Sequence, residues 1–247
     1  HDPSPAGRDI DVHLFVSRFC LERHRALDEP AAAPPTHDVL HNPVDADHFA
    51  AACPPDRERP AAVGRLARPD PGKWSALAMA WLPHALAAVP GLAYRVIGGI
   101  DAGRDYVAAH GLEDAVEFLP PAQTDADLAR FFNSIAVLAH ANDTGESFGL
   151  AIAEAMAAGL PVVTHPCPWP KDNAQVELVE HGVTGYVCES AEEYGRAVAR
   201  LLARPDEARA MGEAGRAKAR RLFRAQDQAA RLAEVYEALL ERKGVTP

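Results

Sequence analysis

Short apolar runs alternate with amphipathic stretches along most of the chain. Eight runs predict strands, at residues 12–16, 38–41, 61–66, 94–98, 116–119, 135–139, 161–164 and 185–188. Helical spacing of apolar positions predicts helices at residues 17–27, 74–88, 126–132, 149–158, 176–180 and 191–202. Runs such as 135–139 are apolar at every position, as in strands that are covered on both faces. The pattern therefore predicts an α/β fold with a doubly wound, mainly parallel sheet.

Proline-rich segments divide the N-terminal part of the chain. Residues 30–35 cannot continue a helix, and residues 53–60, rich in proline and charge, predict an exposed connection. Residues 1–45 then hold one strand and one helix, which cannot bury an apolar face alone. We expect residues 1–45 to be the trailing edge of an N-terminal domain whose main part is missing here. Residues 46–224 would form the main domain and residues 225–247 a C-terminal helix.

The predicted C-terminal helix carries an apolar stripe at helical spacing. The stripe consists of Leu232, Val235, Tyr236, Leu239 and Leu240. Two interpretations stay open, namely packing on the local sheet or crossing to the neighbouring domain.

Composition narrows the class of protein. With 48% hydrophobic and 24% charged residues among 247, the chain is typical of a folded soluble protein. Its net charge of −10 repels phosphate backbones, which argues against a nucleic-acid partner. No apolar run reaches the roughly 18 residues that span a bilayer, and no signal peptide is visible. The four scattered cysteines favour reduced thiols, so we expect a cytoplasmic protein.

Several local motifs that resemble functional sites do not predict one here. His37 and His41 imitate a zinc-binding helix, but the segment predicts a strand, where positions four apart are separated by about 13 Å. Ser147 is not in a Gly-x-Ser-x-Gly elbow, and no phosphate-binding Walker loop is present. We therefore predict no metal site.

A basic cluster precedes the C-terminal helix and has two readings. It consists of Arg216, Lys218, Arg220, Arg221 and Arg224. Such a run is usually a solvated helix face, and the second reading is a peripheral membrane contact.

The segment from residue 146 to 163 carries the most chemical information. It follows a buried strand, and a helix begins near Gly149 and stops at Gly159. Ligands of open α/β sheets bind beyond the carboxyl ends of strands. The first N–H groups of this helix, from Phe148, Gly149 and Leu150, would point at a phosphate there. Gly149 has no Cβ to keep the ligand away.

Charged side chains complete this picture. Glu146 and Glu154 each suit the paired hydroxyls of a sugar, and Glu154 lies in a nearly all-apolar helix where an unpartnered charge is costly. Arg65 and Lys73 follow another strand at the same edge and would supply positive charge to a diphosphate. Arg68 is a weaker candidate. A diphosphate between two sugar-binding carboxylates describes a nucleotide sugar.

These residues resemble a known family. Glu146 and Glu154, with Ser-Phe-Gly between them and Glu-Ala-Met-Ala-Ala-Gly-Leu-Pro-Val-Val after, are similar to the Glu-x7-Glu signature of retaining glycosyltransferases of the GT-B fold. That family includes sucrose synthases, phosphatidylinositol mannosyltransferases and bacterial capsule and lipopolysaccharide transferases. Residues 15–19, 39–45, 63–65 and 176–187 also match family segments. The likeness runs from about residue 12 to 236.

The resemblance implies a role for each matching residue. Glu146 would contact the donor sugar, Glu154 the ribose hydroxyls, and the N–H groups of Phe148 to Leu150 the distal phosphate. Ser147 would also belong to the nucleotide-sugar site. Arg65 and Lys73 would stabilise the leaving diphosphate. The family implies retention at the anomeric carbon and needs no metal or other cofactor. The acceptor would be a sugar, a lipid-linked molecule or a small molecule. This chain would be the donor-binding half, inactive alone.

Two departures from the family pattern concern loops. Pro120 and Pro121 stand where a glycine normally leads the loop that binds the base, and proline has no N–H to offer. Residues 171–175 replace a glycine pair before Glu177.

Three other functions stay open. One is a nucleotide-sugar epimerase, which shares the architecture. A second is a glycoside hydrolase with Glu146 and Glu154 as its acid and base. A third is a non-catalytic module that binds a nucleotide sugar.

Overall fold

The computed structural model describes residues 10–27, 36–55 and 58–245. Its first unit is small: β1 (Val12–Phe15), α1 (Arg18–Leu27) and β2 (Thr36–Val39). The two strands pair in parallel, with His13 opposite His37. Both strands were predicted from their apolar runs, so the domain division that counted a single strand before residue 45 was wrong, and β2 begins two residues earlier than its apolar run suggested. The predicted loop at 30–35 lies outside the described residues.

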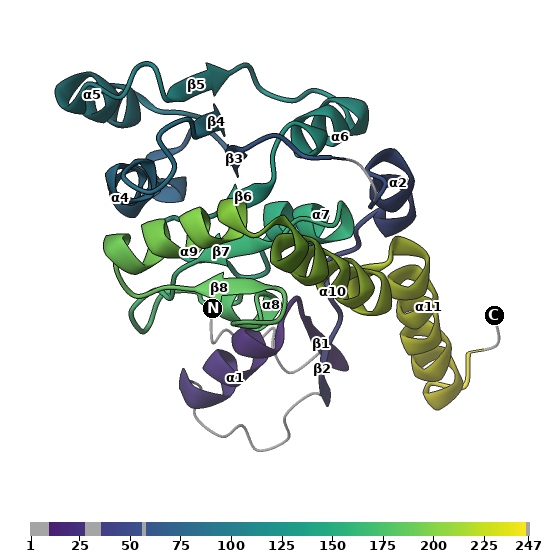
Figure 1. Cartoon of the computed structure of the whole chain (residues 1–247). Helices are drawn as coiled ribbons and strands as arrows, with labels where there is room; N and C mark the ends of the chain where they lie inside the picture. The colour runs from purple at the N-terminus through teal and green to yellow at the C-terminus, as the bar shows by residue number, and fades with distance from the viewer. Residues whose placement is uncertain (1–9, 28–35, 56–57, 246–247) are drawn as a thin grey trace.

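The main sheet has six parallel strands in the order β5-β4-β3-β6-β7-β8 (Figure 1). They are β3 (Ala62–Leu66), β4 (Ala93–Ile97), β5 (Val116–Leu119), β6 (Val137–Ala139), β7 (Val162–Thr164) and β8 (Gly185–Val187). The predicted doubly wound parallel sheet is confirmed. The strand order reverses between β3 and β6, and ligands of such sheets bind beyond the carboxyl ends of the strands at this point.

Helices cover both faces of the main sheet (Figure 1). One core lies among α2 (Ala46–Ala52), α6 (Asp125–Asn133), α7 (Leu150–Ala157), α8 (Gln175–Leu178) and α10 (Pro205–Phe223). The other lies among α3 (Leu77–Ala80), α4 (Leu82–Leu86), α5 (Asp101–His110) and α9 (Ala191–Ala203). Neighbouring strand residues alternate between the two, since Leu138 belongs to the first core and Val137 and Ala139 to the second. This explains why β6 is apolar at every position.

Some helices differ from the prediction. The expected helix at 74–88 is split into α3 and α4 after a short 3₁₀ turn, η2 (Pro71–Lys73), and Pro83 is the second residue of α4. Helices α2 and α5 were not predicted. Helix α2 makes part of the expected exposed connection wrong, because Cys53 at its end is fully buried.

The basic cluster at residues 216–224 is divided between the interior and the surface of the protein. Arg216 donates to the carbonyl oxygens of Cys53 and Ala158, at 2.6 and 3.1 Å. Lys218 is buried and pairs with Glu180 at 2.7 Å. Arg224 pairs with Asp47, also at 2.7 Å, whereas Arg220 and Arg221 are exposed. The expected solvated face is therefore wrong for Arg216 and Lys218, whereas Arg220 and Arg221 lie on the surface.

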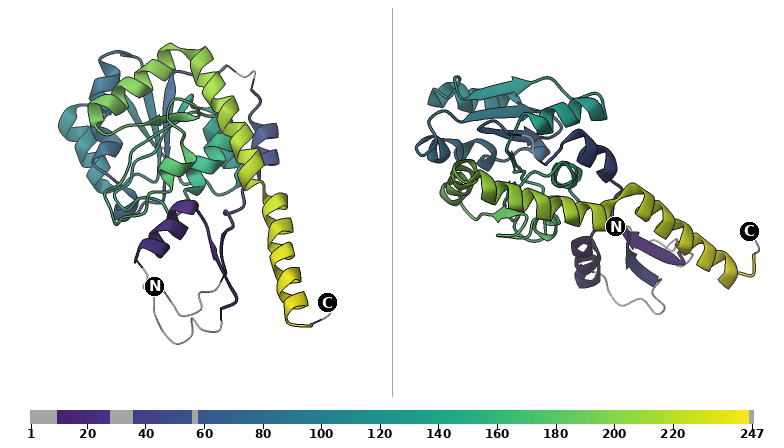
Figure 2. Two further views of the ribbon diagram at one scale, coloured as in Figure 1. Left: turned by 90° about the horizontal axis from the view of Figure 1, so that it is seen from below. Right: turned by 45° about the vertical axis from the view of Figure 1, so that its right-hand side comes forward.

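The last helix, α11 (Ala225–Arg242), projects away from the main sheet and runs beside β1 and β2 (Figure 2). Arg231 pairs with Asp38 of β2, and Lys243 with Asp11 just before β1. Gln228 is its only buried residue among those described, so packing of the apolar stripe on the main sheet is wrong. The structure thus favours the crossing interpretation. In the described part of the chain, no helix combines the length and apolar character needed to cross a membrane.

Candidate functional site

The loops that follow β3 and β6 meet at the switch point of the sheet. Arg65 joins them, because its Nη1 donates to the carbonyl oxygen of Ala141 at 2.6 Å and its Nη2 to that of Lys73. Thr144 Oγ1 adds a bond to the carbonyl oxygen of Gly72 at 2.9 Å. Arg65 is 1% exposed, and burial lowers its pKa. In this geometry Arg65 positions the two loops, and its contact with a phosphate stays a prediction.

The Glu146 carboxylate lies at the centre of the site and has three partners. Lys73 Nζ is 2.9 Å from Oε2, whereas Asn142 Nδ2 and His140 Nε2 lie 2.7 and 3.2 Å from Oε1. Burial alone would raise the pKa of Glu146, but the hydrogen bonds from His140 and Lys73 and the positive charges of their protonated forms outweigh it and lower the pKa to about 2. Glu146 is therefore ionised at neutral pH, with Lys73 as its positive partner.

His140 connects Glu146 to the interior. Burial lowers the pKa of His140, so the ring is neutral at pH 7 and acts on Glu146 through a hydrogen bond. Because an ionised carboxylate only accepts, Nε2 must carry the proton. Nδ1 then accepts from the hydroxyl of Thr164, 3.0 Å away and fully buried. The chain Thr164–His140–Glu146 thus sets one tautomer and one carboxylate position.

The backbone of Glu146 is fixed as well. Its N–H donates to Gln175 Oε1 at 3.0 Å, and its carbonyl oxygen accepts from Ala174 N–H at 2.8 Å. Gly145 has φ +70°, and a Cβ there would lie 1.6 Å from the Asp172 carbonyl oxygen, so only glycine fits. The unusual 171–175 segment therefore holds the loop that bears Glu146 through the buried Gln175 side chain. Sequence reasoning found neither this role nor those of His140 and Asn142, although the polar run 140–146 after a buried strand was a signal.

The N-terminus of α7 opens beside Glu146. Gly149 has φ +104°, a conformation that side chains rarely adopt, and Leu150 then starts the helix. The N–H groups of Leu150 and Ala151 have no acceptor one turn earlier within the helix. The Phe148 ring is buried against the rings of His41 and Phe223, and this packing fixes the backbone that leads into α7.

A cavity of about 340 Å³ lies in front of this helix end. It is lined by Asn42, residues 65–68, Lys73, His140, Asn142 and residues 146–151. The structure therefore brings together Glu146, Lys73, Ser147, Phe148, Gly149 and Leu150, as predicted from the sequence. Arg68, the weaker candidate, also lines the cavity and is exposed.

Glu154 lies further along α7 and is not part of this lining. Burial raises its pKa to about 7, and the charge of Asp125 adds to the rise. Asp125 begins α6, directly after the loop that contains the exposed Pro120 and Pro121. Glu154 therefore lies close enough to Asp125 at the start of α6 to be affected by its charge, and its contact with the ribose stays a prediction.

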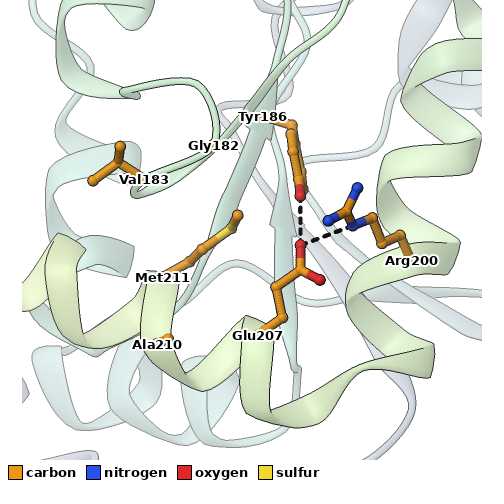
Figure 3. A pocket seen from close by; sticks show the side chains of 7 residues that line it. All are labelled: Gly182, Val183, Tyr186, Arg200, Glu207, Ala210 and Met211. Carbon is orange, nitrogen blue, oxygen red and sulfur yellow. Dashed lines mark hydrogen bonds and ion pairs between the residues drawn. The ribbon is translucent and has the colours of Figure 1, made fainter.

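A second, more open pocket of about 550 Å³ lies elsewhere, between β8, α9 and α10 (Figure 3). Its polar groups are already paired: Glu207 accepts from Tyr186 Oη at 2.5 Å and from Arg200 Nε at 2.8 Å. Val183 and Met211 form an apolar side. The larger pocket thus offers no concentrated charge for chemistry, in contrast to the site at Glu146.

Comparison with known proteins agrees with the predicted class. A family model described as "Glycosyl transferases group 1" matches residues 58–204. The GDP-mannose-dependent alpha-(1-6)-phosphatidylinositol monomannoside mannosyltransferase of Mycobacterium tuberculosis is 31% identical, over 92% of this chain and 62% of that protein. The D-inositol 3-phosphate glycosyltransferase of Segniliparus rotundus is 32% identical, over 94% of this chain and 54% of that protein. The chain thus spans less than two thirds of the length of these relatives.

Solved structures share the fold. Sucrose-phosphate synthase from Thermosynechococcus elongatus superposes with a TM-score of 0.75 at 23% identity, over 94% of this chain and 59% of that one. HepE from Anabaena, in complex with UDP and glucose, gives 0.71 at 22% identity, over 94% and 64%. The α/β fold expected of GT-B enzymes is therefore confirmed. Because the family model covers more than half of the sequence, this chain belongs to the group 1 glycosyl transferase family.

Proposed function

We propose that this chain is the donor-binding half of a retaining glycosyltransferase that takes a nucleoside diphosphate sugar as its donor. One observation carries the proposal, namely the Lys73–Glu146 pair beside the open N-terminus of α7 at the switch point of the sheet. A cation and free N–H groups suit a diphosphate, and an ionised carboxylate suits sugar hydroxyls.

Each group has one task in the proposed reaction. Lys73 and the N–H groups at the start of α7 would stabilise the negative charge that grows on the leaving diphosphate as the glycosidic bond breaks. Glu146, held ionised by Lys73, His140 and Asn142, would accept hydrogen bonds from the donor sugar. Glu154 would accept from the ribose hydroxyls. Because Lys73 and these N–H groups can stabilise the leaving diphosphate, we propose that its departure needs no metal ion.

The relatives guide the choice of substrates. The mycobacterial relative is named as GDP-mannose-dependent and acts on a phosphatidylinositol mannoside, and HepE was solved with UDP and glucose. We propose a GDP- or UDP-sugar donor and an acceptor that is a sugar, a lipid-linked molecule or a small molecule such as an inositol phosphate. The acceptor would bind to a second domain outside this chain. The reaction would take place in the cytoplasm, and at the membrane surface where the acceptor is a lipid.

Glycoside hydrolysis is less well supported. Two carboxyl groups with widely separated pKa values, about 2 for Glu146 and about 7 for Glu154, resemble the acid and base of such enzymes. In a hydrolase, however, both would flank the same bond. Glu154 does not line the cavity that contains Glu146, so the pair does not share one substrate-sized space.

Calorimetric titration of the chain with GDP, UDP and ADP tests the proposal. At least one should bind, and Lys73→Ala should weaken its affinity by about 10- to 100-fold, because a hydrogen bond to a charged group contributes about 1.5–3 kcal/mol. Lys171→Ala is the matched control, since Lys171 is exposed and outside the cavity lining. Binding of none of the three nucleotides, or equal loss in both variants, would contradict the proposed donor site.

A further inference from the structure

We propose that His13, His24 and His37 form a site for a divalent transition metal ion, with Zn²⁺ as the best fit. The three residues come from β1, α1 and β2, respectively. One ring nitrogen from each lies within 4.8 Å of the other two. This site is separate from the candidate donor pocket, and it does not depend on the proposed function.

The fold itself brings the three imidazoles together. His13 and His37 are direct partners in the parallel β1–β2 ladder, so their side chains leave the same face of the small sheet. His24 lies in the last turn of α1, which packs over that face. The ring centroids are 4.9 to 5.7 Å apart, and the ring planes cross at 67 to 81°. The rings are therefore not stacked on one another, and their edges can turn toward one point.

This arrangement is close to the one that zinc requires. Three imidazole nitrogens on a tetrahedral Zn²⁺, each about 2.0–2.1 Å from the metal, lie about 3.3 Å from one another. Small side-chain rotations would bring the nitrogens from their present separation to this one. All three histidines are half-buried, so an ion would be partly shielded while a fourth position stays open to water. Phe15 stacks on His13, with ring centroids 4.2 Å apart, and covers one side of the cluster.

The donor set selects the class of metal. Among the described residues, the group holds nitrogen ligands alone, with no carboxylate or thiolate in it. Imidazole suits Zn²⁺, Cu²⁺, Ni²⁺ and Co²⁺, whereas Mg²⁺ and Ca²⁺ prefer oxygen. The sequence pattern directed attention to His37 with His41, but His41 contacts Phe148 and Phe223 instead. The partners of His37 come from a neighbouring strand and a helix, which no local spacing reveals.

A bound ion would tie α1 to the small sheet. The other end of α1 contacts the main domain, because the N–H groups of Arg18 and Phe19 bond to Glu177, and Cys20 Sγ lies 3.3 Å from the carbonyl oxygen of Ser147. The proposed metal would therefore hold in place a helix that lies directly beside the candidate donor pocket.

Titration of the metal-free, tag-free chain with Co²⁺ tests the site, because tetrahedral Co²⁺ has visible absorption bands that report its ligands. We expect about one equivalent to bind, and Zn²⁺ to displace it. His13→Ala, His24→Ala and His37→Ala should each weaken binding about tenfold or more, since each removes a ligand. His110→Ala is the matched control, because His110 is exposed on α5 and lies outside the group. Failure of the unmodified chain to bind, or retained affinity in the three variants, would overturn the proposal.

X-ray absorption of the Zn²⁺-loaded, unmodified chain gives a second test that depends on no variant. The spectrum should show three imidazole nitrogens at about 2.0–2.1 Å and one further light atom. Fewer than three imidazoles, or sulfur in the coordination shell, would place the ion elsewhere and overturn the assignment.

Discussion

At the scale of single residues, the two glutamates of the candidate site lie in opposite electrostatic surroundings. Glu146 has a cation and two neutral hydrogen-bond donors within reach, whereas Glu154 has burial and the nearby carboxylate of Asp125. One α-helix and the loop before it thus hold one carboxylate that is always charged at neutral pH and one that titrates near it. The difference arises from the neighbours, because the two side chains are chemically identical.

Glu154→Gln should stabilise the chain, and by more at higher pH. The pKa of Glu154 is about 7 in the fold against an ordinary value of 4.5, so the folded state favours the protonated form. This preference stabilises the fold fully below pH 4.5, and the stabilisation is lost as pH rises through 7. At higher pH the ionised Glu154 costs the folded state at most about 3 kcal/mol. Glutamine imitates the protonated form and removes that penalty.

Thermal melts at pH 5.5 and 8.5 measure this effect. The gain in melting temperature of Glu154→Gln should be larger at pH 8.5. Glu234→Gln, on the exposed side of α11, serves as the control and should leave both melts unchanged. An equal gain at both pH values would mean that ionisation of Glu154 is not what the fold opposes.

Thr164→Val should destabilise the chain by about 1–3 kcal/mol, because the buried His140 Nδ1 loses its donor. Nε2 would keep its proton for the Glu146 carboxylate, and Nδ1 would remain as a buried acceptor without a donor. Thr164→Ser keeps the hydroxyl and is the matched variant. Urea unfolding compares the two, and a larger loss for Thr164→Ser than for Thr164→Val would show that packing of the Thr164 methyl group matters more than the hydrogen bond.

At the scale of elements, the Arg216 side chain connects α10 to the C-terminal ends of two other helices. From α10 its guanidinium reaches the carbonyl oxygens at the ends of α2 and α7, where helices leave acceptors without partners. Gly159, which follows α7, has a positive φ and lies against the same side chain. Arg216 therefore caps the C-terminal ends of both α2 and α7. The N-terminal end of α7 lies at the candidate site.

Arg216→Ala should cost about 2 kcal/mol of stability, since two charged hydrogen bonds to backbone carbonyls are lost. Arg221→Ala, an exposed neighbour in the same basic cluster, should be close to neutral. Chemical denaturation of both variants measures the difference. If Arg221→Ala cost as much as Arg216→Ala, net charge on α10 rather than the helix-end contacts would be the cause.

At the scale of the whole molecule, few contacts join the small N-terminal unit to the six-stranded domain. Glu177 caps α1 across 159 residues of sequence, with its two oxygens 3.2 and 2.9 Å from the N–H groups of Arg18 and Phe19. Val44 and Arg224 form an isolated bridge, so the two segments that connect the units run side by side. The relation between the units thus rests on this helix cap, the narrow crossing and a few polar contacts, among them the Arg23–Asp172 ion pair and the ion pairs of α11 with Asp38 and Asp11.

Glu177→Gln should loosen this junction without unfolding the core. One of the two cap bonds is lost, together with a negative charge that the N-terminus of α1 favours. We expect amide hydrogen exchange in α1 to accelerate about tenfold, which corresponds to about 1.4 kcal/mol, while exchange in the six-stranded sheet is unchanged. Glu192→Gln on the exposed face of α9 should alter neither. Faster exchange in β3 and β6 as well would show that the two units open together.

Much of the fold could be predicted because buried positions appear in the sequence as a periodic pattern of apolar residues. The continuous apolar run at β6 showed a strand covered on both faces, and Gly149 and Gly159 marked the ends of α7. Helix α5 was missed because Gly103 interrupts its pattern, and that glycine is explained only by the Trp74 ring packed against it. For the site, Glu146 and Lys73 could be predicted from their positions after strands, whereas His140, Asn142 and Gln175 could not.

The sequence by itself therefore determined the alternation of strands and helices, the loop that bears Glu146 and the helix whose N-terminus faces it. These features follow from local spacing, because strand and helix periods repeat over a few residues. Only the tertiary structure decided that Arg65 joins two loops, that Glu154 lies near Asp125 and that three distant histidines meet. Such contacts link residues far apart in the chain, and the order of strands in the sheet sets their distances.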